Sequence, residues 1–212
     1  VHKRFPLPDW RALRAGAVWI AAVALLAACA RTPTLAPLPP DGVVLAFGDS
    51  LTHGTGAVAD AAYPARLAAL IGRPVVNAGV PGETSAEGAA RLPGVLAEQR
   101  PRLVLLCLGG NDLLRGLPPA AIEANLRLML RTIQASGAEA VLIGVPEPRL
   151  FGGTPGFYAQ LALEAGVPYE GELMNTVLKM PALKSDPIHP NAAGYDAIAR
   201  GLADLLQRAG AL

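Results

Sequence analysis

Residues 43–52 read VVLAFGDSLT, an apolar run that ends in Gly-Asp-Ser. A short apolar run bounded by a turn is typical of a buried strand in a parallel sheet that is covered on both faces. Ser50 then stands just past the carboxyl end of this strand, at the edge of an open α/β sheet where active sites lie. A serine hydroxyl alone is inert, so its meaning depends on whether the chain also supplies a base, an orienting carboxylate and oxyanion donors.

Short apolar runs continue to alternate with segments of helical period along the chain. Further strands are predicted at 74–77, 103–108, 139–145 and 167–169. Helices are predicted between Pro118 and Gly137 and from Tyr195 toward Gly210, because apolar residues recur there at helical spacing. Five parallel strands joined by right-handed crossovers predict an α/β fold, a flavodoxin-like three-layer α/β/α sandwich with the first strand near the centre of the sheet.

The first 28 residues differ in composition from the rest. Residues 1–14 carry four basic side chains against one acidic, and residues 15–28 are all apolar or small. The apolar run is shorter than the roughly 18 residues that a membrane-spanning helix needs, so a cleaved signal peptide over 1–28 is favoured over an anchor helix. The leader ends Leu-Ala-Ala-Cys at Cys29, which resembles the bacterial lipobox, in which the cysteine is lipidated and becomes the mature N-terminus.

This leader predicts an exported protein, held by a lipid on Cys29 at the periplasmic side of a bacterial membrane. The alternative is an ordinary signal peptide with a chance cysteine, which gives a soluble periplasmic or secreted protein. Residues 31–40 contain four prolines and no apolar periodicity. Residues 29–40 are therefore predicted to form a tether, extended rather than packed, ahead of one domain over 41–212 that is long enough for a single packed core.

Charge and cysteine content exclude several classes of protein. The formal net charge is +1, and removal of the leader's surplus of three positive charges leaves about −2. No basic stripe for nucleic acid is visible. If Cys29 is lipidated, Cys107 has no partner, so no disulfide is expected. Cys107 lies inside an apolar strand with no histidine nearby, which predicts a buried thiol and not a nucleophile.

The candidate base and its partner lie in residues 185–191, which read SDPIHPN and precede the last predicted helix. The Asp-x-x-His spacing lets one tight loop present both side chains. His189 would take the Ser50 proton, and Asp186 would hold the ring and stabilise its charged form. The rival base is His53, which no carboxylate in a fixed loop orients, so we expect it to line the site instead.

Three groups are candidate oxyanion donors. These are the N–H of Ser50, the N–H of Gly79 in the Asn-Ala-Gly turn after the second strand, and the side-chain amide of Asn111 in Gly-Gly-Asn-Asp after the third. Taken alone, each motif also fits a helix cap or an ordinary turn. Asp112 is interpreted as such a cap or as a support for its loop.

These blocks together resemble the GDSL, or SGNH, hydrolase family, in the right order over residues 43–209. Gly-Asp-Ser-Leu-Thr, Asn-Ala-Gly followed by Gly-Glu-Thr-Ser, Gly-Gly-Asn-Asp-x-x-Arg-Gly and Asp-x-Ile-His-Pro-Asn are similar to its small bacterial arylesterase, thioesterase and lysophospholipase branch. The resemblance implies Ser50 as nucleophile, His189 as base and Asp186 as its orienter. It also implies an oxyanion hole of Ser50, Gly79 and Asn111. The lipobox leader departs from the ordinary secretory signal of many members.

The expected function is hydrolysis of carboxylic esters, and of thioesters, with short to medium acyl chains, through an acyl-enzyme on Ser50. The loop at 146–156 carries Leu150 and Phe151, which could contact an acyl chain, and no insertion is long enough for a lid. The partners expected are a small acyl ester and, through the lipid, a membrane. No cofactor and no metal is implied, because no cluster has ligand spacing.

Three alternatives use the same sequence differently. The first is a carbohydrate O-deacetylase or acyltransferase on the same triad, and the second is a non-catalytic lipoprotein that binds a ligand in the same pocket. The third, a nucleotide-binding loop at 54–59, begins seven residues after its strand and lacks an acidic residue at the end of the second strand. The leaving group and the oligomeric state are open at this point.

Overall fold

The computed structural model describes residues 33–148 and 152–212. The predicted signal peptide, the lipidation site Cys29, and the loop residues Leu150 and Phe151 lie outside the described residues. Within the described part of the chain, no helix is both long enough and apolar enough to cross a membrane.

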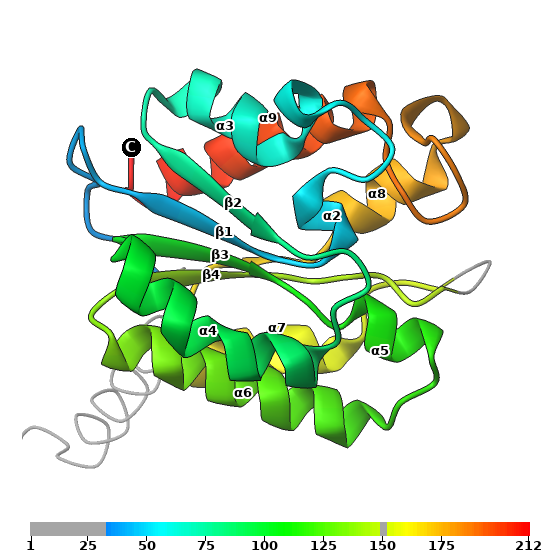
Figure 1. Cartoon of the computed structure of the whole chain (residues 1–212), viewed down its shortest axis with the longest axis horizontal. Helices are drawn as coiled ribbons and strands as arrows, with labels where there is room; N and C mark the ends of the chain where they lie inside the picture. Colours follow the sequence, from blue (N-terminus) through cyan, green and yellow to red (C-terminus); the bar gives the residue numbers. More distant parts are fainter. Residues whose placement is uncertain (1–32, 149–151) are drawn as a thin grey trace, which may run out of the picture. The chain divides into compact units, whose positions relative to one another are not determined.

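Five parallel strands form one sheet (Figure 1). They are β1 (Val44–Gly48), β2 (Val75–Gly79), β3 (Leu103–Cys107), β4 (Glu139–Ile143) and β5 (Tyr169–Glu170). Their order, β2-β1-β3-β4-β5, is the flavodoxin-like order, so the predicted fold class is confirmed. Every residue of β1 and β3 is buried, because helices cover both faces of the central strands.

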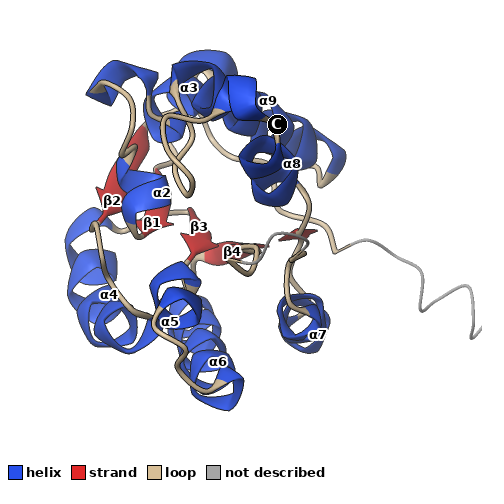
Figure 2. Cartoon of the chain, turned by 90° about the vertical axis from the view of Figure 1, so that its right-hand side faces the viewer, coloured by secondary structure: helices blue, strands red, loops and turns tan. Residues whose placement is uncertain are grey.

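Helices lie on both faces of the sheet, and two short ones stand at its carboxyl edge (Figure 2). One face is covered by α3 (Tyr63–Ile71), α8 (Leu173–Lys179) and α9 (Ala192–Arg208), and the other by α4 (Ser85–Gln99), α6 (Pro119–Ala135) and α7 (Gly156–Ala165). The short helices α2 (Ser50–His53) and α5 (Gly110–Leu114) follow β1 and β3 directly. The 3₁₀ turns η1 (Ala59–Ala61) and η2 (Pro181–Leu183) complete the elements.

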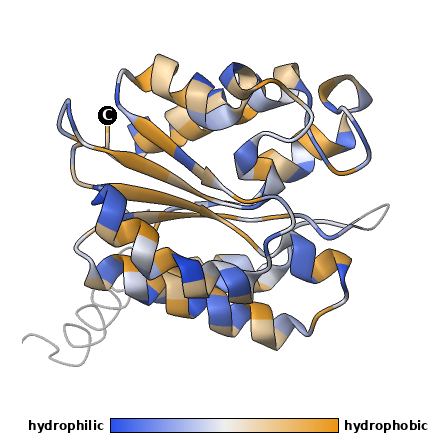
Figure 3. Ribbon diagram, in the orientation of Figure 1, coloured by the Kyte–Doolittle hydropathy of each residue, from blue (hydrophilic) through white to orange (hydrophobic). Residues whose placement is uncertain are grey.

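The helices bury the apolar stripes that the sequence predicts. In α6, residues Ile122, Leu126, Met129 and Ile133 are fully buried, after a proline at the helix start where its missing N–H is not needed. The α4 helix begins with a capping box between Thr84 and Glu87. Figure 3 shows hydrophobic strands between helices whose hydrophilic residues are on their outer sides.

Residues 33–40 correct the expectation of an unpacked tether. This segment is extended, but Leu35 and Leu38 are buried. Their N–H groups donate to the carbonyl oxygens of Ala209 and Ala211, both at 2.8 Å. The prediction that the segment does not pack is therefore wrong from about residue 33 onward. The reason is that Leu35 and Leu38 bury their apolar side chains. Unlike the neighbouring prolines, both leucines have a backbone N–H, and each of these N–H groups finds an acceptor.

Candidate active site

Three elements bring the predicted residues to one edge of the sheet (Figure 1). Ser50 begins α2 immediately after β1, where the side chain of Asp49 accepts the Leu51 N–H at 3.0 Å and caps the helix. Asn111 lies in α5, directly after β3. His189 comes from the loop before α9. The edge position predicted for the site follows because the carboxyl ends of parallel strands all point to one side.

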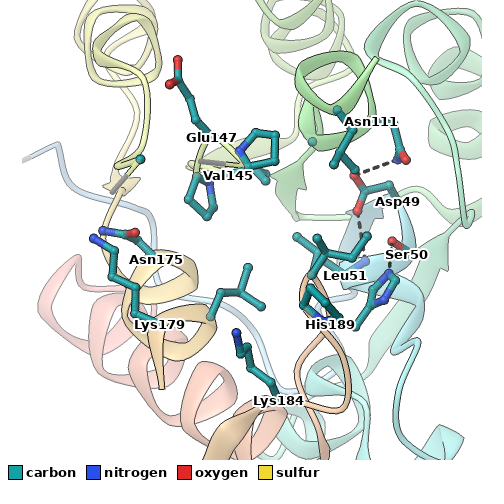
Figure 4. A pocket seen from close by; sticks show the side chains of 18 residues that line it. Asp49, Ser50, Leu51, Asn111, Val145, Glu147, Asn175, Lys179, Lys184 and His189 are labelled. Atoms are coloured by element: carbon teal, nitrogen blue, oxygen red, sulfur yellow. Dashed lines mark hydrogen bonds between the residues drawn. The ribbon is translucent and has the colours of Figure 1, made fainter. Parts of the chain in front are cut away.

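Ser50, His189 and Asp186 form one continuous chain of hydrogen bonds. The Oγ atom of Ser50 is 3.0 Å from Nε2 of His189 (Figure 4), and Nδ1 of the ring is 2.7 Å from Oδ2 of Asp186. With the proton on Nδ1, the ring donates to Asp186 and its Nε2 lone pair can accept the serine proton. The three side chains thus have the relations required of nucleophile, base and orienter.

The loop that carries Asp186 is held by its own hydrogen bonds. Oδ1 of Asp186 accepts the N–H groups of Ile188 and His189 at 2.8 and 2.9 Å, which is an Asx turn. Partial desolvation raises the pKa of Asp186, but the hydrogen bonds from the His189 ring and from both N–H groups outweigh it and hold the pKa below its usual range. The carboxylate therefore stays ionised while it orients the imidazole.

The amide of Asn111 is held on the other side of Ser50. Its Nδ2 donates to the carbonyl oxygen of Glu83 at 3.0 Å. It also donates, more weakly, to Oδ2 of Asp49 at 3.3 Å, the bond drawn in Figure 4. The first bond fixes the amide plane. The second is long enough for a stronger acceptor to compete for that proton.

Asp49 is a buried carboxyl beside the nucleophile. It is 2% exposed, and burial raises its pKa from the ordinary 3.8 to about 7, although the Leu51 N–H and the positive potential of His189 act in the opposite direction. Its charge therefore changes in the neutral range, next to the Asn111 amide. The sequence analysis did not single out this residue; its position between a buried strand and Ser50 was the available signal.

Gly79 does not occupy the role expected of it. Its N–H donates to Oδ1 of Asn77 at 3.0 Å and is therefore already occupied. A Cβ at Gly79 would collide with the backbone of His53, so the glycine is required by the close approach of β2 and α2. The assignment of Gly79 as an oxyanion donor is therefore not supported.

The next glycine of the same motif is better placed. Gly82 adopts a φ of +82° in the turn just before Glu83, whose carbonyl accepts from Asn111. Its own carbonyl accepts from Arg115 at 2.8 Å. Among the residues that the structure describes, its N–H has no acceptor. A free N–H in a turn that is fixed against Asn111 is an available donor.

An ion pair between the buried Glu83 and the part-buried Arg91, which the sequence analysis missed, holds this turn. Nε and Nη2 of Arg91 donate to the two carboxylate oxygens of Glu83, each at 2.6 Å, and Nη2 also reaches the carbonyl of Ala78 at 3.0 Å. The guanidinium lies over the ring of Phe47, 4.2 Å from its centroid. One signal in the sequence could have identified the pair. Arg91 lies on the side of α4 that otherwise faces inward, eight residues after Glu83.

Asp112 supports its loop, as interpreted. Its carboxylate accepts from the N–H of Ser85 at 2.8 Å and from the Ser85 hydroxyl at 2.6 Å. The hydroxyl also accepts from the amide of Asn125 at 2.9 Å. These bonds tie the Gly-Gly-Asn-Asp segment after β3 to the start of α4, so Asn111 is positioned from both sides.

Two further candidates lie outside the site. His53 is exposed, accepts only through its backbone carbonyl from Asn77, and is not among the cavity residues, so the expectation that it lines the site is not met. Cys107 is fully buried and burial raises the pKa of its thiol, so a reactive thiolate is not available.

A cavity of about 420 Å³ opens at Ser50. Apolar side chains form much of its wall, and a few polar groups converge on it, which is the usual character of a small-molecule site. Its lining includes Ser50, Leu51, Asn111, Leu114, Val145, Pro146, Leu178, Lys179, Lys184, Ile188 and His189. Figure 4 shows Asn111, Asp49, Ser50 and His189 together at one end of this cavity.

Comparisons with known proteins agree with this geometry. A model of the GDSL-like Lipase/Acylhydrolase family matches residues 46–197. Thioesterase 1/protease 1/lysophospholipase L1 of Escherichia coli strain K12 is 40% identical over an alignment of 172 residues that covers 77% of this chain and 83% of that protein. Esterase TesA of Pseudomonas aeruginosa is 35% identical over 182 residues, which are 80% of this chain and 90% of that protein.

The fold agrees with solved structures as well. The psychrotrophic esterase EstA from Pseudoalteromonas sp. matches with a TM-score of 0.72 and 25% identity, over 79% of this chain and 98% of that one. The family match spans the serine, the Asn111 segment and the loop with Asp186 and His189. The chain therefore belongs to the GDSL-like lipase/acylhydrolase family and is an ester-hydrolysing enzyme.

Proposed function

We propose that the protein is a serine esterase that hydrolyses carboxylic esters and thioesters of short to medium acyl chains through an acyl-enzyme. The observation that carries this proposal is the hydrogen-bonded chain from Ser50 Oγ through His189 to Asp186, at 3.0 and 2.7 Å. Ser50 and His189 line a cavity that is large enough for a small acyl ester. Such a chain is the arrangement that makes a serine hydroxyl nucleophilic at neutral pH.

The first half-reaction begins when Ser50 Oγ attacks the carbonyl carbon and His189 Nε2 takes the hydroxyl proton. The resulting oxyanion lies toward the Ser50 N–H, the Asn111 amide and the Gly82 N–H. The Asn111 proton that is loosely held by Asp49 at 3.3 Å turns to the oxyanion, which is the stronger acceptor. The Asn111 amide group itself is held in position before charge develops, so only this one N–H changes its acceptor and little reorganisation is needed in the transition state.

The intermediate then collapses, and the alcohol or thiol leaves with the proton that His189 returns to it. In the second half-reaction His189 takes a proton from water, and the hydroxide attacks the acyl carbon of Ser50. Collapse of the second tetrahedral intermediate breaks the bond to Oγ and returns the proton to the serine. Each step reuses the same donors, which is why one site serves both halves.

The limit on acyl length comes from the cavity. A volume of about 420 Å³ with walls such as Leu114, Val145 and Ile188 suits a chain of a few methylenes. Each added methylene that finds apolar contact should lower the activation free energy that corresponds to kcat/KM by up to about 0.8 kcal/mol, until the cavity is filled. The names of the curated relatives, thioesterase and esterase, support the same range of chemistry.

A chain-length series of p-nitrophenyl esters and acyl thioesters tests this function, with lysophospholipids and acetylated sugars as further arms. We expect kcat/KM to rise from acetate to a short or medium chain and then to level off, and Ser50→Ala to abolish turnover. Maximal activity on long-chain triglyceride emulsions, with little on soluble butyrate or hexanoate esters, would overturn the proposed limit to short and medium acyl chains. Preference for acetylated sugars would assign the triad to deacetylation instead.

We also propose that a lipid on Cys29 holds the enzyme at the periplasmic side of a bacterial membrane. The support is the Leu-Ala-Ala-Cys sequence that ends the apolar leader. Cys29→Ser should release the protein from the membrane fraction and leave the activity of the domain unchanged. Mass spectrometry of the mature N-terminus decides the point, because an unmodified N-terminus contradicts the anchor.

A further inference from the structure

The lysines of this chain are distributed unusually. The sequence contains 18 lysines and arginines together, of which only Lys3, Lys179 and Lys184 are lysines. Both of the lysines that the structure describes line the cavity at Ser50. The arginines, by contrast, are spread over the sequence, and the cavity lining contains none of those described.

Four of the described arginines pair with carboxylates, whereas the two described lysines do not. Arg66, Arg91, Arg127 and Arg200 each form an ion pair with a carboxylate. Within residues 33–148 and 152–212, neither Lys179 nor Lys184 forms an ion pair or a side-chain hydrogen bond. Their positive charges are therefore available to a ligand in the cavity.

The acidic residues at the cavity are not placed to neutralise them. Glu147 also lines the cavity, but Figure 4 shows its carboxylate on the opposite side, turned away from the lysines. Asp49 lies at the far end beside Asn111. Asp186 is in the same loop as Lys184, but its carboxylate is bonded to the His189 ring and to two backbone N–H groups. The two described basic side chains of the cavity therefore come from α8 and the loop after it, and no ion pair joins either of them to a described carboxylate.

Lys184 is held in a fixed relation to His189. It is half-buried, and its backbone forms an isolated antiparallel bridge with Pro190. Its carbonyl accepts from the Asn191 amide at 3.2 Å, and the next N–H, that of Ser185, donates to the His189 carbonyl at 3.0 Å. Figure 4 shows its ammonium pointing into the cavity. Lys179, the last residue of α8, lies farther from Ser50, beyond Lys184.

The reaction itself identifies the part of the substrate that meets these lysines. His189 must hand its proton to the departing oxygen or sulfur, so the leaving group lies against the loop that carries His189. Lys184 belongs to that loop. A lysine ammonium is a compact, mobile charge that suits phosphate or carboxylate oxygens without demanding one geometry.

We propose that Lys184, with Lys179 beyond it, forms an anion-binding subsite for the leaving group, and that the preferred substrates are esters or thioesters whose alcohol or thiol carries a phosphate or carboxylate. This proposal rests on the proposed esterase function and adds its substrate class. The apolar wall of the cavity contacts the acyl chain, while the lysines bind the negative charge on the leaving group, on the other side of the scissile bond. Lys184 carries the larger share because it belongs to the loop that carries His189.

Matched substrates test the subsite on the full enzyme. The pair with an aryl leaving group is 4-nitrophenyl butyrate and 3-carboxy-4-nitrophenyl butyrate, and the phosphate pair is 1-butyrylglycerol and 1-butyrylglycerol 3-phosphate. We expect Lys184→Met to lower kcat/KM for the anionic member of each pair by about tenfold, and for the neutral member by less than about twofold. Lys184→Arg should restore most of the preference, Lys179→Met should have a smaller effect, and added salt should reduce the preference of the unaltered enzyme.

Two controls separate the possible causes. Arg131→Met removes an exposed cation from α6, outside the cavity, and should leave both members unchanged. The mono-4-nitrophenyl ester of glutarate carries its charge on the acyl side and should be insensitive to Lys184→Met. Equal losses on neutral and anionic substrates, or a loss confined to the glutarate ester, overturn the subsite while the esterase function stands. Absence of turnover of every ester by the unaltered enzyme would refute the proposed function itself.

Discussion

The two sides of Ser50 are built in opposite ways. On the base side, the Asp186 side chain is 43% exposed and His189 is 14% exposed, and the loop is ordered chiefly by its own short-range hydrogen bonds. On the donor side, Asp49 and Glu83 are 2% and 6% exposed and are fixed by partners from other elements. The carboxyls respond accordingly: hydrogen bonds lower the pKa of Asp186, and burial raises that of Asp49.

This difference follows from what each side must do. The base transfers a proton in both half-reactions and must meet incoming water, so its loop lies at the surface, where both ester and water can arrive. The donors must be aimed before charge develops, because a donor that reorients during the reaction loses part of its stabilising effect. A buried network such as the one around Glu83 and Asn111 resists that reorientation.

The largest effect tests the base side. His189→Ala should match Ser50→Ala and lower kcat by roughly 10⁴-fold or more, because members of a triad act as a unit. His53→Ala is the matched control and should change kcat little. Steady-state kinetics on p-nitrophenyl butyrate measure all three variants, with circular dichroism to confirm folding. Comparable losses in both histidine variants would show that the base assignment is incomplete.

The next effect tests the donor side by removing its amide. Asn111→Ala should lower kcat by about 10²- to 10³-fold, roughly 2.7 to 4 kcal/mol, with KM little changed. The reason is that the amide meets the oxyanion and not the ground-state carbonyl. A change confined to KM contradicts this role, since it would place Asn111 in substrate binding alone.

A smaller effect concerns the ion pair that supports the donor side. Arg91→Met leaves the carboxylate of Glu83 buried and unpaired, and should lower the free energy of unfolding by about 3 kcal/mol. Arg127→Met breaks an exposed pair with Glu164 and should lower it by no more than about 1 kcal/mol. Urea unfolding compares the two variants. If both variants lose the same free energy of unfolding, burial of Glu83 does not make its pair with Arg91 more important than an exposed pair.

The smallest effect concerns the buried carboxyl of Asp49. Its pKa in the folded protein is about 7, above the ordinary 3.8, so the stability that it contributes is complete below 3.8 and is lost as pH rises through about 7. The native protein should therefore lose about 1 kcal/mol more than Asp49→Asn between about pH 6 and pH 8. Urea unfolding at both pH values measures this, and titration of His189 is shared by both proteins. Equal pH slopes would show that Asp49 keeps an ordinary pKa.

Much of the fold and of the triad could be predicted from local patterns. The apolar runs located all five strands within two residues of where they begin. The signal is clearest for β1 and β3, because a strand buried on both faces needs a continuous apolar sequence. The loop with Asp186 and His189 was predictable for a similar reason. Asp186 and His189 are three residues apart, and the Asx turn between them brings their side chains together through hydrogen bonds within the loop.

The donor side could not be predicted in the same way, because its contacts join residues far apart in sequence. The N–H of Gly79 is not free, because it donates to the side chain of Asn77. The close approach of α2 to Gly79 also fixes the position of this glycine. The packing of Leu35 and Leu38 likewise depends on the end of α9 and the chain beyond it, more than 170 residues later.

The sequence by itself determined the order of strands and helices, the nucleophile and the base loop, since each depends on periodicity or on a few adjacent residues. Only the tertiary structure decided the pKa of Asp49, the donor turn at Gly82 and the gathering of both described lysines in one cavity. The physical reason is that burial and charge depend on what the fold places nearby, and the free energy of a buried charge is set by neighbours that sequence distance does not reveal.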